Sequence, residues 1–208
     1  MGRIRNIAFD LGGVIGTIDQ SQAVKRFEEI GLKDAAERLD PYTQTGIFGD
    51  LEAGKISAEQ FKAEIERLVG HPLTDDELVY AWTGYFKEVP LRNLHLLDNL
   101  RKQGYKLILL SNTNPFVQRW ANSEKFSEEG RGLASYFDAR YLSYECRLMK
   151  PDERIFRKML VDEQIMPDET LFVDDSPRNV AAASELGITT FCPVNGDDWT
   201  SEIFEYLK

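Results

Sequence analysis

Short apolar runs, separated by helical patterns, recur along this 208-residue chain. The runs are three to six residues long and mainly apolar, with Arg5, Asn6, Lys106, Thr189 and Thr190 as the polar exceptions. Continuous apolar runs of this kind are typical of strands that are buried on both faces of a parallel sheet. We therefore expect four core strands, over residues 4–9, 106–110, 171–173 and 188–191.

Three helical patterns lie between successive runs, one in each interval. Each places apolar residues three or four positions apart, which is the spacing of one helix face. Gly104 stands where a helix C-cap belongs, and Ser176 stands before a helix with proline at its first position. Alternation of strands and helices predicts an α/β fold with a Rossmann-like, doubly wound parallel sheet. The predicted helices cover residues 92–103, 152–164 and 177–186.

Residues 16–89 show a different pattern, in which no strand is evident. Apolar spacing predicts three helices there, and Ser57 with Gln60 forms a capping-box signature at the start of the second. We interpret residues 16–89 as a helical cap domain inserted into a core of residues 1–15 and 90–208. An insertion after the first strand lies over the sheet edge at which α/β folds bind ligands.

The formal net charge of −10 and the absence of a basic stripe disfavour binding to nucleic acid or to an anionic membrane. No apolar run reaches the roughly 20 residues that span a bilayer. The opening segment MGRIRNIAFDLGGVIG is interrupted by Asp10 and a glycine pair, so we interpret it as the first strand rather than a signal peptide. Cys146 and Cys192 are expected to be free thiols in the cytoplasm. We expect a monomer or a weak homodimer.

Polar side chains follow three of the predicted strands. Asp10 follows the first, Ser111 the second, and the pair Asp174 and Asp175 the third. Because the carboxyl ends of parallel strands meet at one edge of a sheet, these groups are expected to lie together. Adjacent acids repel each other unless a cation binds nearby, so the pair predicts a metal site.

Four segments carry a family resemblance. FDLGGVI, LLSNTN, MKPDERIF and LFVDDSPRNV resemble, in order and approximate spacing, the four motifs of the haloacid dehalogenase (HAD) superfamily. The longer stretches YLSYECRLMKPDERIF and LFVDDSPRNVAAASELGIT resemble bacterial sugar-phosphate phosphatases, including those acting on α-glucose 1-phosphate. The resemblance implies a Mg²⁺-dependent phosphatase of a small phosphorylated metabolite.

The resemblance also implies roles for single residues. Asp10 matches the nucleophile that forms an aspartyl-phosphate. Mg²⁺ would be held by Asp10, Asp175 and the backbone carbonyl of Gly12, with Asp174 in support. Lys150 and Ser111 match the residues that hold the phosphoryl oxygens. Further phosphate contacts are expected from backbone N–H groups near Gly12, Gly13 and Asn112, with Thr113 in second rank.

Gly12 departs from the superfamily pattern, in which a second Asp serves as general acid and base. Loss of positioned acid–base help costs about 10²–10⁴-fold in rate. Asp19 or a cap residue is the alternative proton donor, although an acid before a helix is more often a cap. In the glycine-punctuated stretch 46–57, Phe48 and Glu52 are candidates for contact with the leaving group; a plain interhelix turn is the alternative.

Two other functions stay open at this point. A 2-haloacid dehalogenase shares the fold and the nucleophile, but needs no metal and usually replaces an acid of the fourth motif. A noncatalytic HAD-fold phosphate-binding or regulatory protein would explain Gly12 as lost activity. Of the remaining residues, Trp82, Tyr85 and Phe86 are expected to be cap core, and His71 and His95 surface residues.

Overall fold

A computed structural model describes residues 3–40 and 44–207. Its core is a five-stranded parallel sheet in the order β5-β4-β1-β6-β7, which confirms the predicted doubly wound α/β fold. All four predicted strands are present, and one further strand extends the sheet beyond β4. The strands are β1 (Asn6–Phe9), β4 (Lys106–Ser111), β5 (Ala139–Leu142), β6 (Thr170–Val173) and β7 (Thr189–Phe191).

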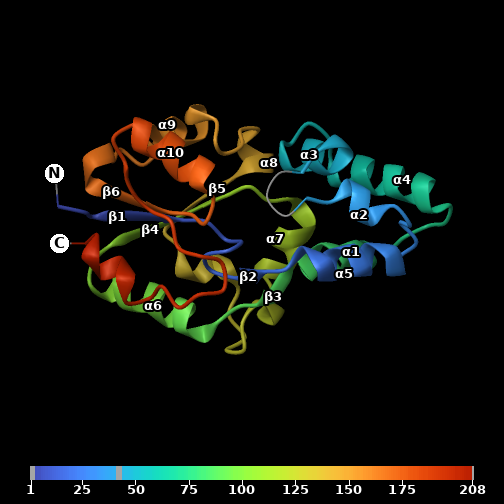
Figure 1. The fold of residues 1–208 in the computed structure, drawn as a ribbon, viewed down its shortest axis with the longest axis horizontal. Coiled ribbons are helices and arrows are strands. Elements are labelled where there is room, and N and C mark those ends of the chain that lie inside the picture. Colours follow the sequence, from blue (N-terminus) through green and yellow to red (C-terminus); the bar gives the residue numbers. More distant parts are fainter. Residues whose placement is uncertain (1–2, 41–43, 208) are drawn as a thin grey trace.

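Helices cover both faces of this sheet. Alternate residues of β1 point to opposite sides: Ala8 packs in the cluster beneath α9 and α10, whereas Ile7 and Phe9 pack in the cluster that contains α6. Figure 1 shows α9 and α10 on one face and α6 on the other, with both termini at the end away from the helices that lie within residues 20–82. The three helices span Leu91–Lys102 (α6), Glu153–Asp162 (α9) and Pro177–Glu185 (α10), close to their predicted bounds.

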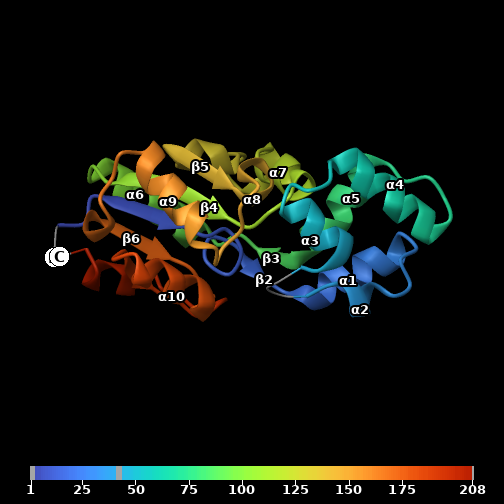
Figure 2. The same ribbon diagram turned by 90° about the horizontal axis from the view of Figure 1, so that it is seen from above.

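Five helices form the second lobe, and we call them the cap helices. Aromatic rings of Phe27, Phe48, Phe61 and Trp82 pack between them with centroids 5.2–5.8 Å apart. The predicted capping box is present at the start of α4. Figure 2 shows these helices gathered at one end of the molecule. They are α1 (Gln20–Glu29), α2 (Ala35–Arg38), α3 (Gly46–Glu52), α4 (Ala58–Val69) and α5 (Asp75–Trp82).

The expectation of no strand within residues 16–89 is wrong. β2 (Thr17–Ile18) pairs antiparallel with β3 (Phe86–Glu88), and together they form the two connections between the sheet and the cap helices. Strands of two and three residues are too short to show a periodic pattern, so the sequence does not reveal them. The exact division between core and cap stays a prediction.

The stretch from residue 123 to residue 136 contributes side chains to the hydrophobic core. Its short 3₁₀ helices, η2 (Glu124–Phe126) and η3 (Leu133–Tyr136), place Phe126, Leu133 and Tyr136 in the core. The remaining elements are α7 (Pro115–Ala121), α8 (Ser143–Cys146), η1 (Thr83–Tyr85), η4 (Pro167–Glu169) and η5 (Glu202–Glu205).

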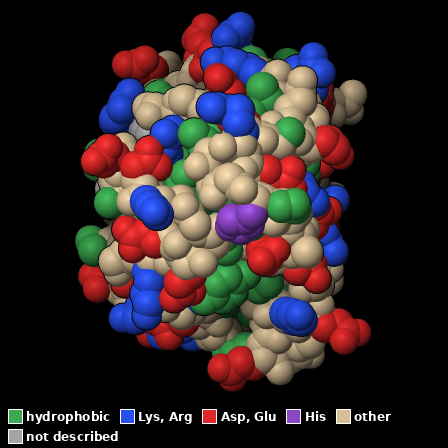
Figure 3. All heavy atoms as spheres, turned by 90° about the vertical axis from the view of Figure 1, so that its right-hand side faces the viewer, with side chains coloured by type: hydrophobic (Ala, Val, Ile, Leu, Met, Phe, Trp, Pro, Cys, Tyr) green, Lys and Arg blue, Asp and Glu red, His purple; other side chains and the backbone are tan. Residues whose placement is uncertain are grey.

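Within the described part of the chain, no helix has both the length and the apolar character that crossing a membrane requires. At the cap end of the molecule, basic side chains lie scattered among acidic ones rather than in a continuous stripe (Figure 3). Cys146 and Cys192 are free, as expected, and His71 and His95 are exposed.

Candidate active site

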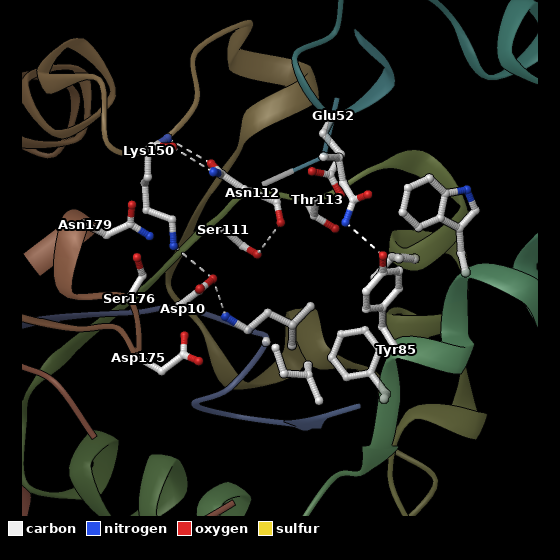
Figure 4. A pocket seen from close by; sticks show the side chains of 17 residues that line it. Asp10, Glu52, Tyr85, Ser111, Asn112, Thr113, Lys150, Asp175, Ser176 and Asn179 are labelled. Carbon is white, nitrogen blue, oxygen red and sulfur yellow. Dashed lines mark hydrogen bonds and ion pairs between the residues drawn. The ribbon is translucent and has the colours of Figure 1, made fainter. Parts of the chain in front are cut away.

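Three neighbouring strands deliver the predicted polar groups to one edge of the sheet. Asp10 directly follows β1, Ser111 ends β4, and Asp174 and Asp175 directly follow β6. Since β4 and β6 flank β1 in register, their carboxyl ends lie on either side of Asp10. Figure 4 shows Asp10, Ser111 and Asp175 around one cavity, with Lys150 above Asp10. The sequence-based grouping of these residues is therefore present in the fold.

Lys150 is the cation at the centre of the cluster. Its ammonium lies 3.0 Å from an Asp10 carboxylate oxygen and 2.6 Å from Asp174 Oδ2, and its side chain is fully buried. Asn112 fixes the backbone of this lysine, because its side chain accepts from Lys150 N–H and donates to Lys150 C=O, both at 2.9 Å. The side chain of Asn112 thus holds the backbone of Lys150 in place.

Asp174 is fully buried and supports the site from behind. Besides Lys150, it accepts hydrogen bonds from Ser176 N–H at 2.8 Å and from the Asn179 amide at 3.0 Å. Both of its oxygens are therefore occupied by protein donors. Asn179 is a site residue that the sequence reasoning missed; its place in the first turn of the helix after the acid pair was the available signal.

Burial strongly perturbs the charged groups. It raises the pKa of Asp10 to about 6, although the charge of Lys150 opposes the shift. It also raises the pKa of Asp175 to about 7, and repulsion from Asp10 adds to the shift. Burial alone lowers the pKa of Lys150, but the charges of Asp10 and Asp174 outweigh it and leave that pKa raised. Three acids around one lysine leave excess negative charge that favours a bound cation.

The donor set fits a hard divalent cation. Carboxylate oxygens of Asp10, Asp174 and Asp175 lie within 4.8 Å of one another. Asp175 Oδ2 is buried and has no hydrogen-bond partner among the described residues, as expected for an oxygen that coordinates a metal ion. Magnesium prefers such oxygen ligands. Because Asp174 is already engaged by protein donors, Asp10 and Asp175 are the side chains that fit the ion, with the Gly12 carbonyl as the further candidate.

Gly13 allows this close approach. Its φ is +76°, and a Cβ at this position would lie 2.1 Å from Asp175 Oδ2. The glycine therefore meets two demands at once, namely a left-handed backbone and the space for a carboxylate. The expectation that Gly13 belongs to the site thus has a steric reason in addition to any N–H it offers to phosphate.

The cavity above Asp10 is closed on its far side by the cap helices and their connections. On that side its wall is formed by Glu52 at the end of α3, Trp82 at the end of α5, Tyr85 and Phe86. The opposite wall is the sheet edge that carries Asp10, Ser111 and Asp175. Trp82 and Tyr85 are also buried, so these two residues both belong to the hydrophobic core, as expected, and form part of the cavity wall. Phe48 does not line the cavity; it is buried in the aromatic cluster of the cap helices, and the proposal that it contacts the leaving group is wrong.

Asp19 lies outside the cavity. It is exposed and caps α1, where its carboxylate accepts from Ser21 N–H at 2.9 Å. Asp19 as an alternative proton donor is therefore excluded by position. Gly12 lines the cavity but offers only backbone groups, and Thr113 lines it with its N–H bonded to Ser143 Oγ at 2.9 Å.

Comparison with known proteins places this geometry in a family. The model of haloacid dehalogenase-like hydrolases matches residues 4–187. The chain belongs to the haloacid dehalogenase-like hydrolase family. It is 50% identical over 205 residues to a D-ribitol-5-phosphate phosphatase of Bacteroides thetaiotaomicron, covering 99% of each chain.

Solved HAD structures superpose on the whole chain. A predicted HAD-like family hydrolase from Porphyromonas gingivalis has a TM-score of 0.92 and 43% identity, with 100% of this chain and 99% of that chain covered. A wild-type HAD family enzyme from Bacteroides thetaiotaomicron, in complex with magnesium and inorganic phosphate, has a TM-score of 0.87 and 36% identity, covering 97% and 99%. An L-2-haloacid dehalogenase shares the fold alone, at 18% identity and a TM-score of 0.59.

Proposed function

We propose that this HAD-family hydrolase is a Mg²⁺-dependent phosphatase that hydrolyses a small phosphomonoester, a sugar or sugar-alcohol phosphate, through an aspartyl-phosphate on Asp10. The observation that carries the proposal is that the Asp10 carboxylate lies beside the Lys150 ammonium and close to Asp175, whose buried Oδ2 has no hydrogen-bond partner among the described residues. The name of the 50% identical relative and the magnesium and phosphate in a solved neighbour support it.

Asp10 is held as a nucleophile. One of its carboxylate oxygens accepts from Leu11 N–H at 2.7 Å and lies 3.0 Å from Lys150. These contacts fix the rotamer and favour the ionised form, which is the form that attacks phosphorus. When bound, Mg²⁺ neutralises charge on the phosphoryl group and brings two anions together. Lys150 and Ser111 would contact the phosphoryl oxygens, and Asp174 orients Lys150 by accepting a hydrogen bond from its ammonium.

The cavity walls favour a small polyhydroxylated leaving group. Tyr85 and Gln44 line it, and the Gln44 amide donates to the Tyr85 hydroxyl at 2.9 Å. Glu52 and Thr113 contribute further polar groups to the same wall. Polar groups of this kind bind the hydroxyls of a ligand by hydrogen bonds and so fix its orientation. We expect the protein to act in the cytoplasm, where phosphorylated metabolites occur, as a monomer or weak homodimer.

The dehalogenase alternative is less well supported. The family resemblance implies that those enzymes need no metal, whereas Asp175 in this chain has a buried oxygen without a hydrogen-bond partner among the described residues, which suits a metal ion. A noncatalytic phosphate-binding role gives no reason for the fixed nucleophile geometry of Asp10.

The experiment is a release assay of inorganic phosphate on a panel of sugar and sugar-alcohol phosphates, with Mg²⁺ and with EDTA. We expect turnover that needs the metal and is fastest on one ester of this class. Phosphate release from none of these esters, by folded protein with Mg²⁺ present, would remove the proposal. Chloride release from a 2-haloacid in EDTA would favour the dehalogenase instead.

A further inference from the structure

Gly12 leaves the proposed reaction without a proton donor next to the nucleophile. The alcohol that leaves a sugar phosphate needs a proton as the P–O bond breaks, and positioned acid catalysis is worth about 10²–10⁴-fold. In an in-line displacement the leaving oxygen lies opposite the nucleophile. The donor must therefore stand across the cavity from Asp10, on the side formed by the cap helices.

Few titratable groups of the described residues face this cavity, and most of them already have another role in the proposed reaction. Asp10 is the proposed nucleophile, Asp175 fits the metal, and Lys150 is paired with two carboxylates. Burial raises the pKa of the Tyr85 phenol far above neutrality, so this group cannot exchange a proton in each cycle. The group that remains is Glu52 at the end of α3.

Glu52 stands in the required direction. Figure 4 shows its side chain entering the cavity from the cap side, with Ser111 and Asn112 between it and Asp10. The turn that follows Glu52 packs directly against the backbone of the sheet domain. Gly54 in this turn leaves no room for a side chain, because a Cβ there would lie 2.2 Å from the backbone oxygen of Tyr144. This close backbone approach holds the end of α3 against the sheet domain.

The surroundings of Glu52 favour its protonated form at neutral pH. Burial raises the pKa of Glu52 to about 8; the Asn114 amide opposes this shift and the charge of Asp10 adds to it. No lysine, arginine or histidine of the described residues contributes a compensating charge. An arriving phosphate anion adds to the same repulsion, so the carboxyl enters the reaction with its proton.

We propose that the carboxyl of Glu52, rather than a residue beside Asp10, is the general acid and base of this enzyme; the inference rests on the phosphatase function proposed above. In the first step an Asp10 oxygen bonds to phosphorus, and the P–O bond electrons pass to the leaving oxygen, which takes the Glu52 proton. In the second step water enters where the alcohol left. Glu52 accepts a proton from this water as its oxygen bonds to phosphorus, and the Asp10–phosphorus bond breaks.

The test uses esters that differ only in how much the leaving group needs a proton. Phenyl phosphate and p-nitrophenyl phosphate both lack sugar hydroxyls, but nitrophenolate leaves readily without protonation. For Glu52→Gln, we expect kcat/KM to fall by about 10²-fold or more for phenyl phosphate and by less than about tenfold for p-nitrophenyl phosphate. Glu59→Gln, the same change at an exposed position in the first turn of α4, is the matched control and is expected to match the wild type.

A pH profile supplies a second readout. Because the protonated form of Glu52 is the active one, wild-type kcat/KM for phenyl phosphate should decline as the pH rises through about 8, the pKa of this carboxyl. Glu52→Gln should lack this decline. The charged and titratable groups that share the cavity are Asp10, Lys150, Asp175 and Tyr85, and all of them are retained in the variant.

The outcomes separate the two proposals. A wild type that is inactive on both esters removes the phosphatase function itself. An active wild type with equal losses on both esters in Glu52→Gln shows a structural or binding role, and unchanged rates show no role; either result overturns the acid–base assignment alone.

Discussion

Substitution of Gly13 by alanine tests whether the position of Asp175 controls activity. The new Cβ would lie 2.1 Å from Asp175 Oδ2, whereas ordinary contacts begin at 3.4 Å, so the carboxylate must move by about 1.3 Å (3.4 − 2.1). A left-handed alanine costs about 1–2 kcal/mol relative to glycine. Forcing atoms into a packed site adds about 1–3 kcal/mol. We therefore expect the free energy of unfolding to fall by about 2–5 kcal/mol.

Gly70→Ala is a control that places alanine in a left-handed backbone conformation without displacing a neighbouring side chain. Gly70 ends α4 with φ of +80°, close to the +76° of Gly13, but a Cβ there would meet nothing within 4 Å. It should lose only about 1–2 kcal/mol of unfolding free energy. For a chain of this length, each kcal/mol lowers the melting temperature by about 2–4 °C.

Activity separates the two variants further. A catalytic group misplaced by about 1 Å can lower the rate by about 10²-fold. Phosphate release with Mg²⁺ should therefore fall by about that factor in Gly13→Ala and stay at the wild-type level in Gly70→Ala, at a temperature where both are folded. Thermal melts and release assays that find the two variants alike would refute the steric reasoning.

Two further substitutions test the charge cluster and a helix end. Lys150→Met leaves Asp10 and Asp174 buried without their cation and should lower the free energy of unfolding by about 3–5 kcal/mol, with loss of phosphate release; urea denaturation at wild-type stability would contradict this. Ser57→Ala removes the capping box of α4 and should cost about 1 kcal/mol in the same measurement while phosphate release is unchanged; a change in kcat would show that α4 affects the site.

The strand ends were predictable because the polar residues of the site directly follow the apolar runs that form the buried strands. Asp10, Ser111 and the pair Asp174 and Asp175 each follow a mainly apolar run, and parallel strands bring such ends together. The large helices were predictable for the same reason, since their apolar spacing is regular. The strand β5 was missed because its four residues include two polar or small ones at the sheet's edge.

Other features depend on contacts between distant segments. Pairing of β2 with β3 joins residues about 70 positions apart and has no local signal. Phe48 and Glu52 lie one helical turn apart, yet Phe48 faces the aromatic cluster of the cap helices and Glu52 faces the cavity. Only the packing of α3 decides which of the two side chains lines the cavity.

Trapping of the covalent intermediate tests the central claim most directly. Enzyme mixed with its preferred phosphate ester and Mg²⁺ is quenched in acid, digested and analysed by mass spectrometry. The account predicts a peptide heavier by one phosphoryl group, with the modification on Asp10, and no such peptide with EDTA or in Asp10→Asn. Phosphate release by Asp10→Asn at the wild-type rate, or a phosphoryl group on another residue during turnover, would contradict it.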